Sequence, residues 1–160
     1  MTYSNLGRCE EALCIERDVY SGFLKLKGEE HEDTLIAAQN YAASLFGLDR
    51  FEESKSVLRK MMPVARRVLR DNHRLALKMR WNYAKALYRD AAATFDDLRE
   101  AVTTLEDVTR IARRVFGGAY PLTVNIEEEL RDARAALAAR KGDDVSSVCE
   151  GVAAMTAKGA

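Results

Sequence analysis

Apolar residues recur at the spacing of an α-helix along most of this chain. Between residues 32 and 47, Leu35, Ala38, Ala42 and Leu45 follow one another at intervals of three or four residues, and positions spaced in this way share one helix face. Residues 51–69 carry a comparable apolar stripe. The pattern predicts six helices, over residues 8–27, 32–47, 51–69, 74–90, 97–116 and 121–140.

The helical pattern repeats with a period of 42 residues. A shift by that distance superimposes Asn40-Tyr41-Ala42 on Asn82-Tyr83-Ala84 and His31 on His73. A third copy follows at an offset of 47, once five residues are inserted near 91–95. Paired helices repeated at this length predict an all-α solenoid of tandem antiparallel helix pairs.

The repeat divides the chain into units. We expect one array over residues 1–140, made of a partial repeat (1–31), a repeat (32–72), a repeat with the insertion (73–119) and a terminal helix (120–140). Alignment of the copies makes residues 1–6 the last turn of a helix that precedes the helix at 8–27. Gly142, followed by two aspartates, predicts a stop, so residues 141–160 are expected to form either a loose tail or a short capping helix.

The repeated residues resemble tetratricopeptide repeats, in particular the 42-residue type found in kinesin light chains. The family pattern corresponds here to His31-Glu32-Asp33-Thr34-Leu35, Asn40-Tyr41-Ala42 and Asp49-Arg50-Phe51-Glu52-Glu53-Ser54. The resemblance covers about residues 3–140. It implies a short right-handed solenoid whose concave face binds another protein. The third copy departs from the pattern, because Glu129-Leu130-Arg131 replaces the Asn-x-Ala element.

Composition narrows the class of protein without naming a function. The chain has 160 residues, 48% of them apolar, and 25 basic residues balance 25 acidic ones. A net charge of zero gives no whole-chain case for nucleic acid, so we do not expect nucleic acid as a partner. Three scattered cysteines make no disulfide framework, so we expect a cytoplasmic protein. No apolar run is long enough to insert into a membrane.

Candidate chemistry is sparse. His31 and His73 occupy the same corner of successive repeats, too far apart to share a metal ion, so we expect both to be structural. Cys9 falls opposite Phe51 in the repeat and is expected in the core. The acidic run Glu127-Glu128-Glu129 is interpreted as a solvated helix face. We therefore predict no catalytic, metal or cofactor site, and no enzyme activity.

The charge distribution points to one surface. Residues 55–90 carry eleven basic and two acidic side chains. In tetratricopeptide repeats the first helix of each pair lines the concave groove, and the resemblance places Lys78, Trp81, Lys85 and either Tyr88 or Arg89 there. The groove asparagine of the family maps to Asn40 and Asn82. The predicted peptide-binding residues are Asn40, Lys78, Trp81, Asn82, Lys85 and Arg89, with an acidic peptide segment as the expected ligand. The alternative for Trp81 is a plain core position between helix pairs.

The sequence thus predicts a protein-interaction module without catalysis. One alternative is a structural subunit of a larger assembly that lacks a free groove. Another is a regulatory repeat segment of a longer enzyme. At the N-terminal edge, the helix expected at 8–27 lacks a hairpin partner for its apolar residues, which predicts a second copy, a neighbouring subunit or a further repeat against that edge.

Overall fold

The computed structural model describes the backbone of residues 3–156 and the side chains of residues 10–141. Every regular element in this part of the chain is a helix, as predicted. The helices are α1 (Tyr3–Lys27), α2 (Glu32–Gly47), α3 (Phe51–Leu69), α4 (Arg74–Arg89), α5 (Phe95–Phe116) and α6 (Pro121–Thr156). The bounds predicted for α2 and α3 are confirmed to the residue.

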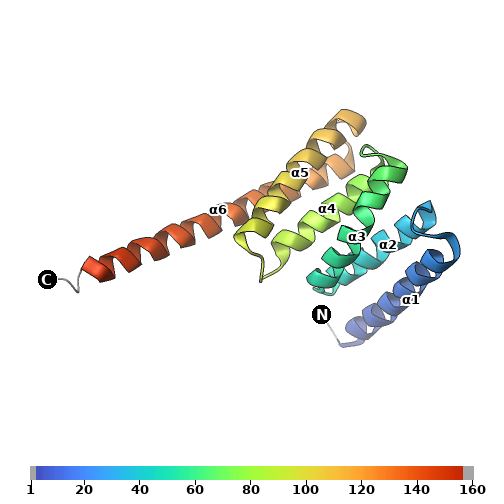
Figure 1. Cartoon of the computed structure of the whole chain (residues 1–160), viewed down its shortest axis with the longest axis horizontal. Coiled ribbons are helices and arrows are strands. Elements are labelled where there is room, and N and C mark those ends of the chain that lie inside the picture. Colours follow the sequence, from blue (N-terminus) through green and yellow to red (C-terminus); the bar gives the residue numbers. More distant parts are fainter. Residues whose placement is uncertain (1–2, 157–160) are drawn as a thin grey trace.

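Each helix packs beside the next one in the sequence, which gives a stack of antiparallel helices with α1 at one end and α5 and α6 at the other (Figure 1). Helix α2 also contacts α4, and α4 contacts α6, whereas α3 contacts neither α1 nor α5 within the described helices. The stack is therefore closer together along α2, α4 and α6 than along α1, α3 and α5. We call the surface formed by α2, α4 and α6 the inner face.

One continuous apolar core runs through the stack. Leu35, Leu58, Leu77, Leu105 and Ile126, from five successive helices, are all fully buried within it. Small residues lie where helices approach one another closely. An example is Ala42 of α2, whose backbone carbonyl accepts a hydrogen bond of 2.8 Å from the Ser54 hydroxyl of α3.

The repeat corners confirm a structural role for the two histidines. His31 is the N-cap of α2 and His73 the N-cap of α4. In each case the ring Nδ1 accepts a hydrogen bond from the backbone N–H two residues later, at 3.2 Å from Asp33 and 3.3 Å from Leu75. An N-cap acceptor satisfies an otherwise unpaired amide of the first helical turn.

The start of α1 differs from the prediction. The expected turn near Gly7 is absent, and one helix runs from Tyr3 to Lys27. At the equivalent place after α2, a turn is closed by backbone bonds such as Leu48 N–H to Ser44 C=O, with Asp49 in the left-handed region. That turn joins two helices that pack on each other. Among the described helices α1 packs only against α2, so no helix hairpin of the kind that α2 forms with α3 holds a turn at Gly7.

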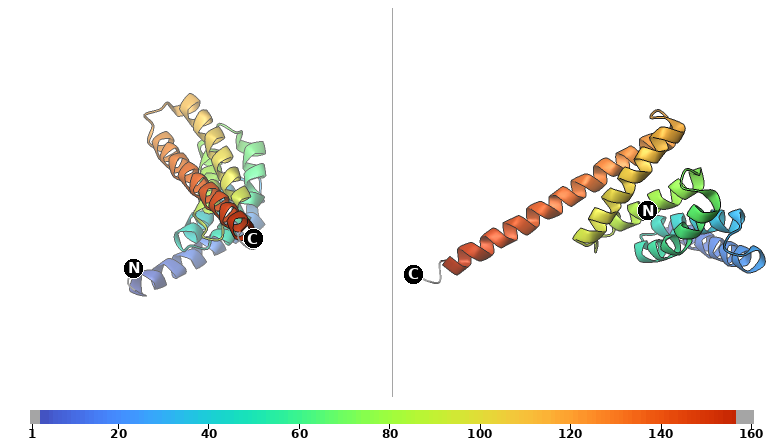
Figure 2. Two further views of the ribbon diagram at one scale, coloured as in Figure 1. Left: turned by 90° about the vertical axis from the view of Figure 1, so that its left-hand side faces the viewer. Right: turned by 45° about the horizontal axis from the view of Figure 1, so that its top comes forward.

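The end of α6 also differs from the prediction, because the helix passes Gly142 and continues to Thr156, projecting beyond α5 (Figures 1 and 2). A single glycine inside a helix costs only about 1 kcal/mol relative to alanine, so it does not by itself stop one. The insertion also supports this stretch of α6: Arg140 donates to the Ala93 carbonyl at 3.1 Å, and the Lys141 ammonium lies 6.0 Å from the Phe95 ring centre.

The five inserted residues are shared between a turn and a helix. The connection between α4 and α5 comprises residues 90–94, against residues 48–50 between α2 and α3. Helix α5 has 22 residues where α3 has 19. The longer helix begins with a capping box, in which Thr94 and Asp97 bond reciprocally to each other's backbone N–H.

Candidate functional site: the inner face

The predicted groove residues of α4 lie on the inner face. Lys78, Trp81, Asn82 and Lys85 are each partly exposed, whereas the opposite side of α4 is buried. The Lys85 ammonium identifies the direction of this stripe, because it lies 4.6 Å from the Phe46 ring of α2 and 3.6 Å from the Glu129 carboxylate of α6. The side chain thus contacts both helices that flank α4 on the inner face.

Glu129 corrects the prediction that its acidic run is a solvated face. Its side chain is only 12% exposed. It accepts hydrogen bonds from the Tyr88 hydroxyl and from Arg89, the latter at 3.2 and 3.3 Å, and it pairs with Lys85. Burial removes the carboxylate from water, and these three donors replace the water it has lost.

The rest of the run is divided. Glu127 bonds to Arg113 of α5 at 2.5 Å, and only Glu128 has the exposed position that was predicted for all three residues. Glu129 stands at an offset of 47 from Asn82, so a carboxylate occupies the place of the asparagine in the third copy. That alignment was the available sequence signal for an inner-face position of Glu129. The partners of Glu129 come from another helix and could not be predicted from the acidic run itself.

The Glu129 contacts change the electrostatics of the predicted groove. Two of its predicted cations, Lys85 and Arg89, already have a carboxylate partner within the chain. Burial and the hydrogen bond to Glu129 together raise the pKa of the Tyr88 hydroxyl above its usual value, in spite of the nearby Arg89. Tyr88 therefore stays a neutral donor at physiological pH. Lys78 is the inner-face cation of α4 without an ion pair among the described residues.

Trp81 combines the two alternatives that the sequence left open. Its ring packs against the core cluster, yet the side chain remains partly exposed. Lys85 lies 5.0 Å from the ring centre, a cation–π arrangement. The indole N–H is shielded from solvent and has no hydrogen-bond partner among the described residues.

The two asparagines predicted to line the groove lie on successive inner-face helices. Asn40 is exposed on α2, and Asn82 is partly exposed on α4. No described residue hydrogen-bonds to either side-chain amide. A carboxamide offers one acceptor and two donors, which is the set needed to bond both the C=O and the N–H of an extended backbone.

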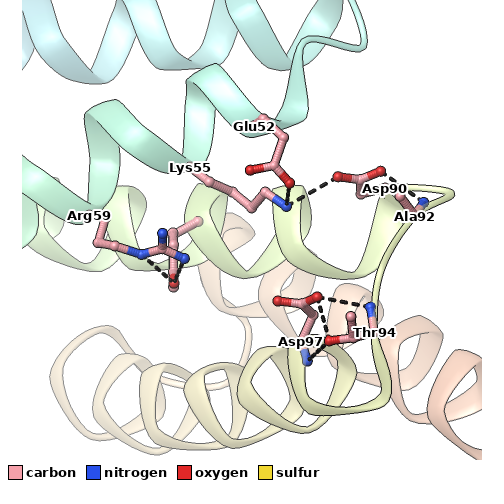
Figure 3. A network of polar contacts seen from close by, with 8 residues as sticks. Glu52, Lys55, Arg59, Asp90, Ala92, Thr94 and Asp97 are labelled. Atoms are coloured by element: carbon pink, nitrogen blue, oxygen red, sulfur yellow. Dashed lines mark hydrogen bonds and ion pairs between the residues drawn. The ribbon is translucent and has the colours of Figure 1, made fainter.

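A second polar cluster lies away from the inner face and is structural (Figure 3). Lys55 of α3 is buried, and its ammonium bonds to Glu52 at 2.5 Å and to Asp90 at 3.1 Å. Burial by itself lowers the pKa of Lys55, but the two carboxylate bonds outweigh burial and raise it. Asp90 also accepts from the Ala92 N–H, and this bond is the main cause of its lowered pKa. The cluster ties α3 to the inserted turn.

On the same side of the array, the hydroxyl of one tyrosine links three helices by hydrogen bonds. The Tyr83 hydroxyl of α4 donates to Glu100 of α5 at 2.9 Å and accepts from Arg59 of α3 at 3.1 Å. The sequence placed Arg59 and Lys55 in a general basic block and gave no sign that their partners fix them in the array. A helical stripe shows which residues share a face, but not which residues of another helix meet them.

A cleft of about 610 Å³ opens between α5 and α6 at the C-terminal end of the stack, away from the inner face. Arginines and glutamates from both helices line it, and the bonds from Arg113 to Glu127 and from Arg134 to Glu106 join the two helices across it. Among the described residues, no three His, Cys, Asp or Glu side chains are placed to hold a metal ion. No described helix is both long and apolar enough to cross a membrane.

Comparison with known proteins supports the fold. No protein-family model matches the chain, and no curated protein matches it in sequence. Two crystal structures of a Podosopora anserina protein, described as a kinesin light chain with nearly identical TPR-like repeats, are similar to it at 22% sequence identity. The TM-score is 0.75 for a point variant of that protein, over 98% of this chain and 71% of the other, and 0.74 for the other structure, over 99% and 72%. The chain therefore has the tetratricopeptide-like fold of kinesin light chain repeats.

Proposed function

We propose that this protein is an interaction module that binds an extended segment of another protein along its inner face. The observation that carries the proposal is the pair of unpartnered amides on adjacent inner helices, Asn40 and Asn82. Two amides in successive repeats can hold successive parts of one extended backbone, since each provides both a donor and an acceptor. A fold of stacked helix pairs is typical of such scaffolds.

Charge and shape suggest the chemistry of the ligand. Lys78 offers an unpaired ammonium next to the partly exposed Trp81 ring, which suits an acidic segment with one apolar anchor. A ligand carboxylate that approaches Lys85 or Arg89 has to compete with Glu129. We therefore expect the acidic residue of the ligand at Lys78, and weaker selection for acid toward α6.

Peptide selection tests the proposal without a known partner. A displayed library of random peptides is selected on the 160-residue chain, and the recovered peptides are measured against N82A, K78E and K60E variants at low and high salt. We expect N82A to weaken binding about five- to tenfold, because a hydrogen bond contributes about 1 kcal/mol. K78E should weaken acidic peptides most at low salt, where charges are least screened.

K60E is the matched control, because Lys60 is an exposed cation of α3, away from the inner face, and it should leave binding unchanged. Recovered peptides that bind wild type and N82A equally, or that lose as much affinity with K60E as with K78E, would refute the inner face as the site.

A further inference from the structure

The outward side of α1 carries an apolar surface that no described residue covers. Its members follow one another at intervals of three or four residues, and we call them the α1 stripe: Ala12, Ile15, Val19, Gly22 and Leu26. Ile15, Val19 and Leu26 are all exposed, Leu26 to 85%. Leu13, which points toward the stack instead, is buried. The exposed side is thus a stripe of the helix and not its whole surface.

The repeat shows what covers such a stripe elsewhere. At an offset of 42, the α1 stripe maps to Ser54, Val57, Met61, Val64 and Val68 of α3. The bond from Ser54 to the Ala42 carbonyl shows that this side of α3 faces α2. Met61 is fully buried there, and so is Val108, its counterpart in α5, whereas Val19 is 45% exposed.

Leu26 is less informative than Val19. Its counterparts in α3 and α5, Val68 and Val115, are each 40% exposed although a helix covers the rest of their stripes. The difference between covered and uncovered stripes is therefore concentrated at Ala12, Ile15 and Val19. Ala12 is exposed where Ser54 and Ala101 are fully buried, and Ile15 is 63% exposed where its α3 counterpart Val57 packs partly buried against the core. A covering helix would have to reach these three residues.

The two helices that cover α3 and α5 share one sequence pattern. Helix α2 has Leu35, Ala42 and Leu45, and α4 has Leu77, Ala84 and Leu87, all six fully buried. Both read Leu-x6-Ala-x2-Leu. The alanine permits the close backbone approach seen at Ser54, and the leucines fill the space on either side.

The third inner helix does not fit the α1 stripe. At the positions of Leu77, Ala84 and Leu87, α6 carries Val124, Arg131 and Arg134, and both arginines are exposed. Docking of α6 from a second copy would place two guanidinium groups against Ile15, Val19 and Leu26. Arg134 pairs with Glu106 and Arg131 with Glu128, but removing such exposed pairs from water costs more than their mutual attraction returns. Head-to-tail stacking of copies is therefore a poor solution.

We propose that the α1 stripe is the docking face for an antiparallel helix supplied from outside residues 3–156, with Leu-x6-Ala-x2-Leu on its contact side. Such a helix would complete a hairpin with α1 as α2 does with α3. The last turn of α1, beside which the incoming helix begins, carries the exposed Lys25, whereas Lys27 already bonds to Asp33 of α2 at 2.5 Å. An acidic first turn, like that of α2, would complement Lys25.

A grafted helix tests this proposal. The full chain is extended at its N-terminus by a flexible Gly/Ser linker and a second copy of residues 31–48, which carries the required pattern. Linking the helix raises its effective concentration at α1. We expect the amides of residues 11–27 to exchange at least about tenfold more slowly in the grafted chain than in the original one. The grafted protein should be monomeric.

Two matched controls separate docking from a general effect of the extension. A graft whose added copy carries Ala42→Arg and Leu45→Arg, the residues found at these places in α6, should leave the exchange of 11–27 fast. V19D should cancel the slowing in the grafted chain. In the original chain V19D should change stability little, because Val19 is already in water, so a folding failure cannot be mistaken for loss of docking.

Three outcomes would overturn the proposal. The graft could leave exchange in α1 unchanged, or the arginine-bearing graft could slow it as much as the intended one. Alternatively, light scattering could show the original chain to be a dimer that V19D dissociates, in which case a second copy covers the stripe. None of these results bears on N82A and K78E, so the inner-face proposal stands or falls separately.

Discussion

The two ends of the helix stack differ in the side chains that they expose to solvent: one end exposes charged residues and the other apolar ones. At the C-terminal end, the outward side of α5 and α6 carries charges that pair across the two helices, Arg113 with Glu127 at 2.5 Å and Arg134 with Glu106 at 2.7 Å. At the N-terminal end, the α1 stripe exposes apolar side chains. Terminal units of solenoids need a polar outer face because no neighbour covers them. By that criterion the C-terminal end is capped and the N-terminal end is open.

The difference is local, because the repeats themselves are alike. Val19 and Val108 hold the same position in the repeat, yet one is 45% exposed and the other is fully buried. Burial of apolar surface contributes about 25 cal/mol per Å². The same residue type is therefore expected to contribute very different amounts to stability at the two places, which can be measured directly.

Val108→Ala should have the largest effect. Removal of two buried methyl groups from a site without exposure should lower the free energy of unfolding by about 2–3 kcal/mol. The same change at Val19 should cost less than about 0.5 kcal/mol, as at ordinary surface positions. Urea unfolding of the two variants measures both. Equal losses would mean that α1 is covered in solution, and the contrast between the ends would disappear.

Glu129→Ala should have the next largest effect. The change leaves Tyr88, Lys85 and Arg89 without their shared acceptor, and an unpaired buried donor costs about 1–3 kcal/mol. Glu128→Ala, on the neighbouring exposed side, is the matched control and should be nearly neutral. Thermal or urea unfolding decides between them. A neutral Glu129→Ala would mean that the carboxylate is not a structural part of the C-terminal half.

The repeat corners predict one stabilising change. Gly28, Arg70 and Gly117 occupy equivalent corners and all have positive φ, of 83°, 70° and 86°. At Arg70 and Gly117 the ψ angles are 161° and 162°. This combination with positive φ is essentially restricted to glycine, and a residue with a Cβ is strained there by about 1–3 kcal/mol. Arg70→Gly should therefore raise the free energy of unfolding by about 1 kcal/mol, and Gly117→Ala should lower it by a similar amount. A destabilised Arg70→Gly variant would show that the arginine side chain outweighs the strain.

Acid should weaken the part of the stack between α3 and α5. Hydrogen bonds from Arg80 and Arg110 lower the pKa of Asp107, and bonds from Ala92 and Lys55 lower the pKa of Asp90. A carboxyl whose folded pKa lies below its unfolded value, about 3.9, contributes stability that is full above that value and is lost as the pH falls through the folded pKa. As the pH is lowered below about 4, the urea concentration at the unfolding midpoint should therefore decrease. It should decrease less steeply in D107N.

The smallest effect is expected from the exposed ion pairs of the C-terminal end. Arg134→Ala removes the bond to Glu106, but both side chains are about half exposed, and such pairs contribute about 0–1 kcal/mol. Its effect should shrink further in 1 M salt. A loss well above 1 kcal/mol would show that these pairs do more than keep the end polar.

Sequence periodicity located the helices that have neighbours on both sides, α2 to α5, to within two residues at each end. Residues 32–47 and 51–69 were located correctly because two copies of the repeat agree on their ends. The ends of the array were predicted less well: α1 has no turn at Gly7, and α6 does not stop at Gly142. Both errors arose because a turn forms where the two helices that it joins pack against each other, and a helix continues where no such packing exists. A local sequence signal carries no information about that packing.

The polar contacts between helices could be predicted least. The stripe of Lys78, Trp81 and Lys85 follows from helical spacing, and the structure places it on the inner face. The partnership of Lys85 and Arg89 with Glu129 does not follow from it, since the residues are about forty positions apart in the sequence. Lys55 likewise gave no sign of burial, because only the inserted turn, with Asp90, brings its partner to it.

Amide hydrogen exchange along the unmodified chain is the most direct test of the contrast between the two ends. We predict that the amides of residues 11–27 exchange faster than those of α3 and α5, because one side of α1 lacks a packing partner and local opening there exposes little additional apolar surface. The amides of residues 121–140, in the part of α6 that packs on α5, should exchange more slowly than those of α1. Protection of residues 11–27 equal to that of α3, in a protein shown to be monomeric at the same concentration, would contradict this account.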